Sequence, residues 1–174
     1  MSNKARNIEL MAFDVDGVLT DGRIYYTEQG EALKTFNTLD GHGLKMLRES
    51  GVKLAIITGR KSKMVERRAQ ELGFDFLYQA VSDKRKALSE LMVQSGIGRE
   101  KMGYMGDDIV DLPVMMAVAF RAAPISAHED VVSRADWVSK RPAGEGAVRE
   151  LCDYLLKARG MYTTLLTPYL QTGF

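Results

Sequence analysis

The chain has 174 residues, of which 45% are hydrophobic and 27% are charged, and these proportions predict one globular domain with a sizeable core. The net charge of +1 gives no reason to expect a nucleic-acid or membrane-surface partner, and no apolar run approaches the roughly 20 residues that span a bilayer. With Cys152 as the one cysteine and only two histidines, an internal disulfide is excluded, a zinc site built from these residues is disfavoured, and a cytoplasmic location is expected.

The first predicted strand is the apolar run "IELMAFDV", residues 8–15. Asp14 and Asp16 stand at its end, and Gly17 follows them directly. Acidic side chains at the inner end of a buried strand indicate that something there needs negative charge. In an extended segment, residues two apart face the same way, so both carboxylates would point at one ligand. Gly17 would let the chain turn sharply beside it.

The next segment, "GRIYYTEQGEALKTFN", residues 22–37, has strand-like ends around a "TEQGE" turn. This pattern predicts a β-hairpin between the first strand and the first long helix. A two-stranded hairpin leaves open edges, which invite pairing with another chain. The alternative is a small flap that faces solvent.

The remainder of the chain alternates short apolar runs with amphipathic stretches. Strands are predicted over residues 52–57, 74–79, 101–106, 118–122 and 135–139. Helices are predicted over residues 39–51, with Asp40 as N-cap, and over 62–73, 83–96, 108–118 and 144–160. This rhythm predicts a single α/β domain over residues 1–174, with a doubly wound, mostly parallel sheet. The apolar tail, residues 161–174, is expected to pack on its own subunit or to be disordered; the alternative is insertion at a neighbouring site.

Polar side chains cluster at the predicted strand ends. The carboxyl ends of parallel strands meet at one edge of a sheet, where ligands gather in doubly wound folds. Any one of these residues alone has an ordinary explanation as a turn residue, a helix cap or a solvated charge. Together they predict a site for Mg²⁺ and a phosphate, because carboxylate oxygens suit a hard cation and a hydroxyl, an ammonium and loop amides suit phosphate oxygens. The set comprises Asp14, Asp16, Thr58, Arg60, Lys84, Asp107 and Asp108.

These motifs carry a family resemblance. The stretches "DVDGVLTDG", "ITGR" and "GDDIVD", together with Lys84, resemble the four motifs of the haloacid-dehalogenase superfamily. Across residues 11–158, "FNTLDGHGLKML", "LYQAVSDK" and "GEGAVRELC" are also similar to the 3-deoxy-D-manno-octulosonate 8-phosphate phosphatases. The resemblance implies a Rossmann-like, capless phosphatase that requires Mg²⁺ and acts in lipopolysaccharide precursor synthesis.

The resemblance also implies a role for each motif residue. Asp14 would be the nucleophile that becomes an aspartyl phosphate, and Asp16 would be the general acid and then the base for water. Asp14, Asp107 and the backbone carbonyl of Asp16 would bind Mg²⁺. Thr58 and Lys84 would stabilise the oxygens of the transferring phosphoryl group.

The same resemblance implies a sugar-acid phosphate as substrate and a homotetramer in which hairpins of several chains pack together. Cations near both ends of such a substrate would suit its carboxylate and its phosphate. The substrate contacts carried over are Asp16, Asn37, Thr38, Leu39, Asp40, Gly41, Lys45, Arg60, Arg68 and Lys84.

Three other functions fit parts of the pattern. A phosphatase of a nine-carbon keto-sugar acid 9-phosphate would share every motif, although Arg60 after "TG" favours the eight-carbon acid. A phosphomutase would need a cap to retain its bisphosphate intermediate. A non-catalytic phosphatase-like interaction module would be expected to lack one of the catalytic aspartates, and all are present.

Overall fold

A computed structural model describes residues 3–171, and its centre is a sheet of six parallel strands in the order β5-β4-β1-β6-β7-β8. The order reverses beside β1, which has β4 on one side and β6 on the other, so the cleft for a ligand is expected where β1 ends. The strands are β1 Leu10–Phe13, β4 Lys53–Ile57, β5 Phe76–Tyr78, β6 Met102–Met105, β7 Phe120–Ala123 and β8 Trp137–Val138.

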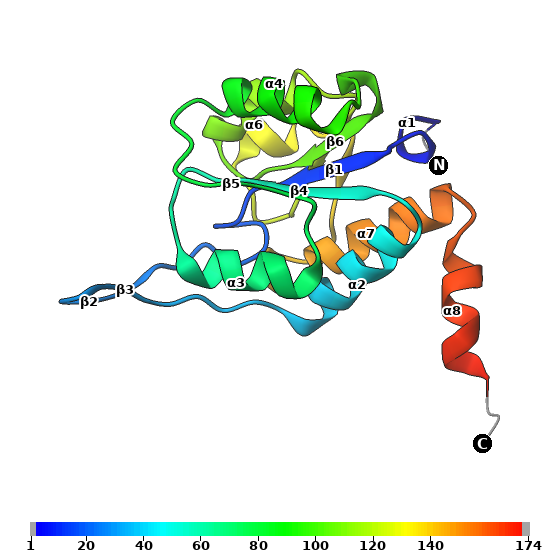
Figure 1. The fold of residues 1–174 in the computed structure, drawn as a ribbon, viewed down its shortest axis with the longest axis horizontal. Helices are drawn as coiled ribbons and strands as arrows, with labels where there is room; N and C mark the ends of the chain where they lie inside the picture. The colour runs from blue at the N-terminus through cyan, green and yellow to red at the C-terminus, as the bar shows by residue number, and fades with distance from the viewer. Residues whose placement is uncertain (1–2, 172–174) are drawn as a thin grey trace.

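Helices cover both faces of this sheet (Figure 1). One layer contains α2 Thr38–Glu49, α3 Lys63–Leu72 and α7 Ala147–Ala158, and the other contains α4 Lys84–Ser95, α5 Leu112–Met115 and α6 Glu129–Val132. The remaining elements are α1 Asn3–Arg6, α8 Tyr162–Leu170 and the 3₁₀ turns η1 Arg99–Lys101 and η2 Ile109–Asp111. The predicted doubly wound α/β fold is confirmed. None of the helices within residues 3–171 has the length and apolar character needed to span a lipid bilayer.

The alternating side chains of β1 divide the core into two parts. Met11 and Phe13 pack in the cluster beneath α2 and α7, whereas Leu10 and Ala12 pack in the cluster beneath α4. Successive side chains of a strand point to opposite faces, so a strand that is apolar at every position must be buried on both. All four residues are at most 1% exposed. This anchoring fixes the point at which the chain leaves β1 and enters the site.

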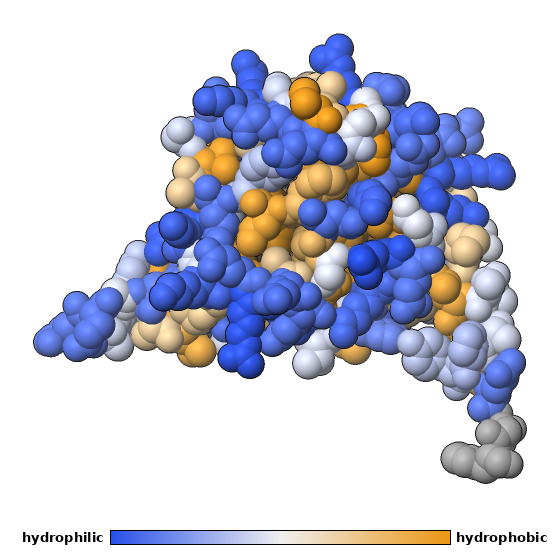
Figure 2. Space-filling model, viewed as in Figure 1, coloured by the Kyte–Doolittle hydropathy of each residue, from blue (hydrophilic) through white to orange (hydrophobic). Residues whose placement is uncertain are grey.

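A separate two-stranded antiparallel sheet is formed by β2 Tyr25–Thr27 and β3 Gly30–Leu33. It extends away from the body of the molecule (Figure 1), and hydrophilic side chains dominate its tip (Figure 2). Closer to the body, Tyr25 and Leu33 are cross-strand partners that are 40% and 48% exposed. Two strands alone have marginal stability in water, so this hairpin depends on contacts beyond itself.

Most helix ends agree with the predicted ones, but the N-cap of α2 differs. The helix predicted over residues 83–96 is confirmed as α4, with Asp83 as its N-cap and Gly96 as its C-cap. Asp40 as N-cap of α2 is wrong: Asn37 caps that helix through its side chain. Asp40 lies inside α2, where its buried carboxylate accepts a hydrogen bond from the backbone N–H of Arg149 in the first turn of α7. A carboxylate suits that place, because the first amides of a helix lack partners of their own.

The C-terminal tail is helical as far as α8 extends, and residues 172–174 lie outside the described part. Tyr162 and Leu165 pack against the core cluster beneath α7. Farther along, the ring of Tyr169 meets that of His42 edge-on at 5.4 Å, yet Tyr169 remains 62% exposed. The described part of the tail therefore packs partly on its own subunit. This helix, like the short helices α1 and α6, was not predicted from the sequence.

Candidate active site

A cavity of about 500 Å³ opens where the central strands end. It collects residues that follow β1, β4 and β6, together with the first residue of α4. All the polar residues predicted at the strand ends line it, although they come from four distant parts of the chain. They are Asp14, Asp16, Thr58, Arg60, Lys84, Asp107 and Asp108.

Asp14 and Lys84 form the base of the cavity. The backbone N–H of Asp14 donates to the carbonyl of Met105, which continues the pairing of β1 with β6 and fixes the residue in place. Its Oδ2 lies 2.8 Å from Nζ of Lys84, and the two side chains are only 10% and 7% exposed. Although burial disfavours an ammonium, Asp14 and Asp111 raise the pKa of Lys84 above its ordinary value. Lys84 is therefore a fixed cation beside Asp14.

Asp111 holds this arrangement together and was not predicted as a site residue. Its Oδ1 accepts hydrogen bonds from Nζ of Lys84 at 2.7 Å and from the hydroxyl of Tyr104 at 2.6 Å. Its Oδ2 accepts from the backbone N–H groups of Asp107 at 3.0 Å and Asp108 at 3.3 Å. Asp111 is fully buried, so both oxygens are occupied within the protein. The last residue of "GDDIVD" thus orients the lysine and the loop, and its position in the quoted motif was the signal for it.

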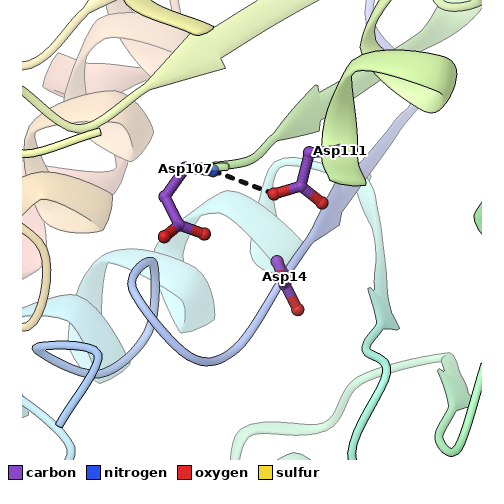
Figure 3. A group of neighbouring side chains, drawn as sticks. All are labelled: Asp14, Asp107 and Asp111. Carbon is purple, nitrogen blue, oxygen red and sulfur yellow. Dashed lines mark hydrogen bonds between the residues drawn. The ribbon is translucent and has the colours of Figure 1, made fainter. Parts of the chain in front are cut away.

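Three carboxylates converge beside the cavity. One oxygen from each of Asp14, Asp107 and Asp111 lies within 4.8 Å of the others (Figure 3). Burial and the neighbouring carboxylates raise the pKa of Asp107 to about 8. Burial, followed by Asp111, also raises the pKa of Asp14, against the opposing effect of Lys84. The raised pKa values mean that ionising all the carboxylates would crowd too much negative charge into one place. A bound cation would balance that charge.

The donor set fits Mg²⁺, the cofactor of this site. Hard cations take oxygen ligands, and Mg²⁺ is commonly held by one or two carboxylates while substrate phosphate and waters complete its shell. Because Asp111 already accepts four hydrogen bonds, Asp14 and Asp107 are the two carboxylates left to bind it. Asp14 and Asp107 are also the two side chains predicted to hold the metal, and their binding of it stays a prediction.

Gly17 allows the loop after β1 to pass close to Asp107. It has φ of +86°, which side chains rarely tolerate, and an added Cβ would lie 2.1 Å from Oδ2 of Asp107. Only glycine provides both the backbone conformation and the space. The predicted sharp turn is confirmed, and it brings the loop that carries Asp16 against the carboxylate of Asp107.

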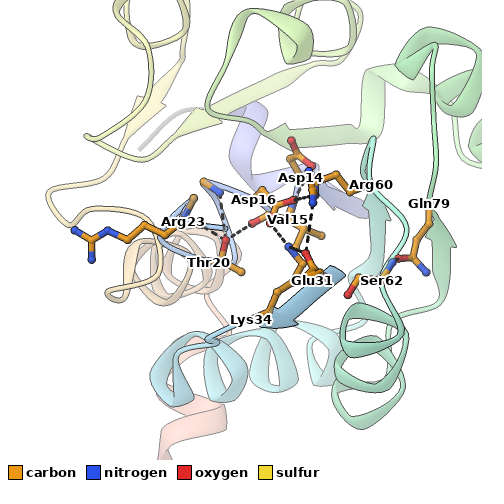
Figure 4. Close-up of polar contacts among 12 residues, drawn as sticks. Asp14, Val15, Asp16, Thr20, Arg23, Glu31, Lys34, Arg60, Ser62 and Gln79 are labelled. Carbon is orange, nitrogen blue, oxygen red and sulfur yellow. Dashed lines mark hydrogen bonds and ion pairs between the residues drawn. The ribbon is translucent and has the colours of Figure 1, made fainter. Parts of the chain in front are cut away.

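Asp16 lies among charges that come mainly from the hairpin (Figure 4). Its Oδ1 pairs with Nζ of Lys34, and its Oδ2 is 3.6 Å from Nε of Arg60. Glu31 completes the cluster, 3.0 Å from Nζ of Lys34 and 3.8 Å from Nη2 of Arg60. The exposed ring of Tyr26 caps it, since its hydroxyl accepts a hydrogen bond of 2.7 Å from Arg60. Neither Lys34 nor Glu31 was predicted, because nothing in the alternation of "GEALKTF" tells which charge turns inward.

Thr58 stands at the end of β4 and is 2% exposed. Its backbone N–H donates to Tyr78, and its carbonyl accepts from the N–H of Val81. These bonds tie the loop after β4 to the loop after β5, and both loops line the cavity. Thr58 is thereby held in the same cavity lining as Asp14 and Lys84.

The structure does not bring the other predicted substrate contacts into this cavity. Asn37 caps α2, and its carbonyl accepts a bond from Arg68, whose guanidinium lies over Phe36. Asp40 is buried against α7. None of these residues lines the cavity within one chain. The set that lies apart comprises Asn37, Thr38, Leu39, Asp40, Gly41, Lys45 and Arg68.

Comparisons with known proteins identify close relatives, although no family model matches the chain. It is 48% identical over 157 residues to the 3-deoxy-D-manno-octulosonate 8-phosphate phosphatase KdsC of Escherichia coli, covering 90% of this chain and 84% of that protein. The KdsC protein of Yersinia pestis is 46% identical over 156 residues, with 90% and 83% covered.

Solved structures of related phosphatases superimpose closely on this chain. A probable YrbI family phosphatase of Pseudomonas syringae superimposes with a TM-score of 0.95 at 45% identity, covering 98% of this chain and 97% of that one. The 3-deoxy-D-manno-octulosonate 8-phosphate phosphatase of Moraxella catarrhalis has a TM-score of 0.92 at 40% identity, with 95% of each chain covered. That structure is a complex with a magnesium ion, a phosphate ion and a KDO molecule.

Proposed function

The chain belongs to the family of 3-deoxy-D-manno-octulosonate 8-phosphate phosphatases, and from this premise we propose that it hydrolyses this phosphate ester to the free sugar acid and inorganic phosphate. It is a magnesium-dependent phosphoric monoester hydrolase of the haloacid-dehalogenase type. One observation carries the assignment: Asp14 is fixed at the end of β1 with Lys84 on one of its oxygens and Asp107 beside it. The product fits a role in lipopolysaccharide precursor synthesis.

In the first step Asp14 acts as the nucleophile. Its carboxylate oxygen forms a bond to phosphorus while the bond between phosphorus and the sugar oxygen breaks. Asp16 gives its proton to the departing oxygen, so the sugar leaves as an alcohol. Lys84 and the Thr58 hydroxyl, which line the same cavity, donate hydrogen bonds to the phosphoryl oxygens as the group transfers.

In the second step water cleaves the acyl phosphate on Asp14. Asp16, now ionised, takes the proton from water as its oxygen attacks phosphorus. The phosphorus–Asp14 bond breaks and phosphate is released. Mg²⁺, held by Asp14, Asp107 and the backbone carbonyl of Asp16, neutralises phosphate charge that would otherwise repel a carboxylate nucleophile. Asp111 contributes by keeping Lys84 and the Asp107 loop in place.

The sugar-acid part of the substrate extends toward the hairpin side of the cavity. Arg60 is 39% exposed at its side chain and lines the mouth, so its guanidinium can pair with a carboxylate. The remaining predicted contacts lie on and around α2, outside this cavity. We assign them to a homotetramer, in which residues such as Lys45 and Arg68 complete the site of a neighbouring copy and hairpins pack together. The buried free thiol of Cys152 suits a reducing compartment, and we propose the cytoplasm.

A substrate panel tests the proposal. Phosphate release with Mg²⁺ is measured for 3-deoxy-D-manno-octulosonate 8-phosphate, for a nine-carbon keto-sugar acid 9-phosphate and for common hexose phosphates. The expected result is the highest kcat/KM for the eight-carbon ester. Preference for the nine-carbon ester would change the substrate but keep the chemistry, and no release from any ester would contradict the function.

A further inference from the structure

Lys34 is the most buried charged side chain of the hairpin region. It follows β3 directly, and its side chain is 1% exposed, although it belongs to a segment in which most neighbours face solvent. Burying an ammonium costs several kcal/mol unless partners replace water. A lysine is therefore expected in such a place only where its charge is used.

The partners of Lys34 are Asp16 and Glu31. Asp16 belongs to the loop after β1, and Glu31 belongs to β3. Arg60 lies within 4 Å of the same two carboxyl groups, so two cations face two carboxyl groups. Figure 4 shows the four side chains pointing toward one another between the end of β1 and the hairpin. Within this cluster Lys34 alone is removed from solvent, because the side chains of the others are 14–39% exposed.

We infer that Lys34 is a positioning residue for the proton-transfer step, which holds the carboxylate of Asp16 so that Oδ2 faces the leaving oxygen of the substrate. The inference rests on the proposed function, since it assumes that Asp16 is the general acid. It adds a role for the hairpin inside the chemistry of its own subunit. Lys34 is not among the residues that line the cavity, so it would act through Asp16.

The geometry gives the physical reason. Lys34 pairs with Oδ1 of Asp16, while Oδ2 lies 3.6 Å from Nε of Arg60, and Asp16 and Arg60 both line the cavity. A carboxylate held at one oxygen cannot rotate freely, and proton transfer needs a heavy-atom separation near 3 Å in the right direction. Glu31 in β3 also pairs with the lysine, so β3 and the residue that follows it supply both the cation and its second partner. The carboxylate of Asp16 thus receives its orientation from a segment that is not part of the central sheet.

The leaving group provides a readout that a merely structural role would not move. Phenyl phosphate and p-nitrophenyl phosphate have nearly the same size, but p-nitrophenolate leaves readily without a proton, whereas phenolate benefits from one. In Lys34→Met, kcat/KM for phenyl phosphate is expected to fall roughly 10-fold or more, and for p-nitrophenyl phosphate only about 2-fold. Glu31→Gln is expected to change the same ratio in the same direction by a smaller factor.

Two controls complete the design. Lys101→Met removes an exposed ion-paired lysine far from the cavity and should leave the ratio of the two esters unchanged. In an Asp16→Asn background, Lys34→Met should cause no further loss with phenyl phosphate, because the group that it positions is gone.

The outcomes separate the inference from the function beneath it. If Lys34→Met lowers kcat/KM for both esters by the same factor, or if its effect adds fully to that of Asp16→Asn, the positioning role is wrong while the phosphatase function stands. If Lys34→Met does not fold, as a thermal melt would reveal, an unchanged ester ratio in Glu31→Gln overturns the inference. No release from either ester by the unaltered protein with Mg²⁺ would overturn the proposed function itself.

Discussion

Two buried lysines stand beside the two aspartates at the end of β1, and they are held by different regions of the molecule. Lys84 lies 2.8 Å from Asp14 and is fixed by Asp111, a fully buried residue whose loop follows a strand of the central sheet. Lys34 pairs with Asp16 and is fixed by Glu31, on a hairpin whose strands pair only with each other. The Asp14–Lys84 pair is therefore supported by the central sheet, whereas the Asp16–Lys34 pair is supported by the hairpin.

The two aspartates are therefore held in place in different ways. A buried hydrogen-bonded network, which includes the hydroxyl of Tyr104, stabilises the charges around Asp14. The charges around Asp16 are stabilised mainly by side chains of the hairpin, a segment that has only marginal stability on its own. Nucleophilic attack should therefore tolerate changes in the hairpin, whereas proton donation and sugar selection should not. Four experiments sharpen this comparison.

Removal of the metal should have the largest effect. Exhaustive chelation should abolish phosphate release from every ester, and Mg²⁺ should restore it, because Asp14 and Asp107 cannot approach a phosphate dianion without a cation. Binding of Mg²⁺ should also raise the melting temperature of the protein, because it relieves repulsion among the carboxylates. Colorimetric phosphate release and a thermal melt check both effects. Full activity in the chelated protein would contradict the metal-assisted mechanism.

Asp14→Asn should come next, with turnover reduced by about three orders of magnitude or more. The amide keeps the size of the side chain but cannot form the acyl phosphate. Because Asp14 is one of several crowded carboxylates, the melting temperature should not fall. Near-normal kcat in this variant would overturn Asp14 as nucleophile.

Asp111→Asn should reduce kcat/KM for p-nitrophenyl phosphate by roughly 10- to 100-fold, as is usual for residues that orient metal ligands. An amide nitrogen in place of one oxygen would face either the ammonium of Lys84 or the N–H groups of Asp107 and Asp108, and all of these are donors. Asp130→Asn, at an exposed carboxylate on α6, is the matched control and should be unaffected. Equal activity in the two variants would mean that the buried network does not position Lys84.

The smallest effect on chemistry is expected from Tyr25→Ser combined with Leu33→Ser. These exposed cross-strand partners should contribute to contacts between hairpins of different copies, so light scattering should detect weaker assembly. Turnover of phenyl phosphate should stay within about twofold, because neither side chain supports Asp16. A clean monomer of the unaltered protein with full sugar-phosphate activity would show that the hairpin is only a flap.

The sequence was sufficient for the features that local chemistry determines. Apolar runs predicted the strands of the sheet, and glycines such as Gly73 and Gly96 marked helix ends, where the structure has left-handed φ values. Parallel topology then required residues after β1, β4 and β6 to meet. The cavity lining of Asp14, Thr58 and Asp107 follows from that requirement alone.

Features that depend on tertiary packing could not be predicted in the same way. Whether Lys34 turns inward depends on how the hairpin folds back over the loop after β1, and periodicity does not encode that. Asp40 looked like an N-cap because it precedes an amphipathic stretch, but Asn37 is better placed for α2. The partner of Asp40 is the amide of Arg149, 109 residues away, and no local pattern indicates a partner so distant.

That hydrogen bond has a consequence for the order in which the protein folds. Helix α7 begins at Ala147, and its N-cap residue, Gly146, makes no side-chain cap hydrogen bond. Its first turn is therefore completed only when α2 supplies Asp40. The two helices pack extensively on each other, and forming a contact between such distant segments requires closing a long loop first. We therefore expect the α2–α7 layer to consolidate late in folding. During synthesis, the face of the sheet beneath α2 should stay incomplete until α7 has emerged from the ribosome.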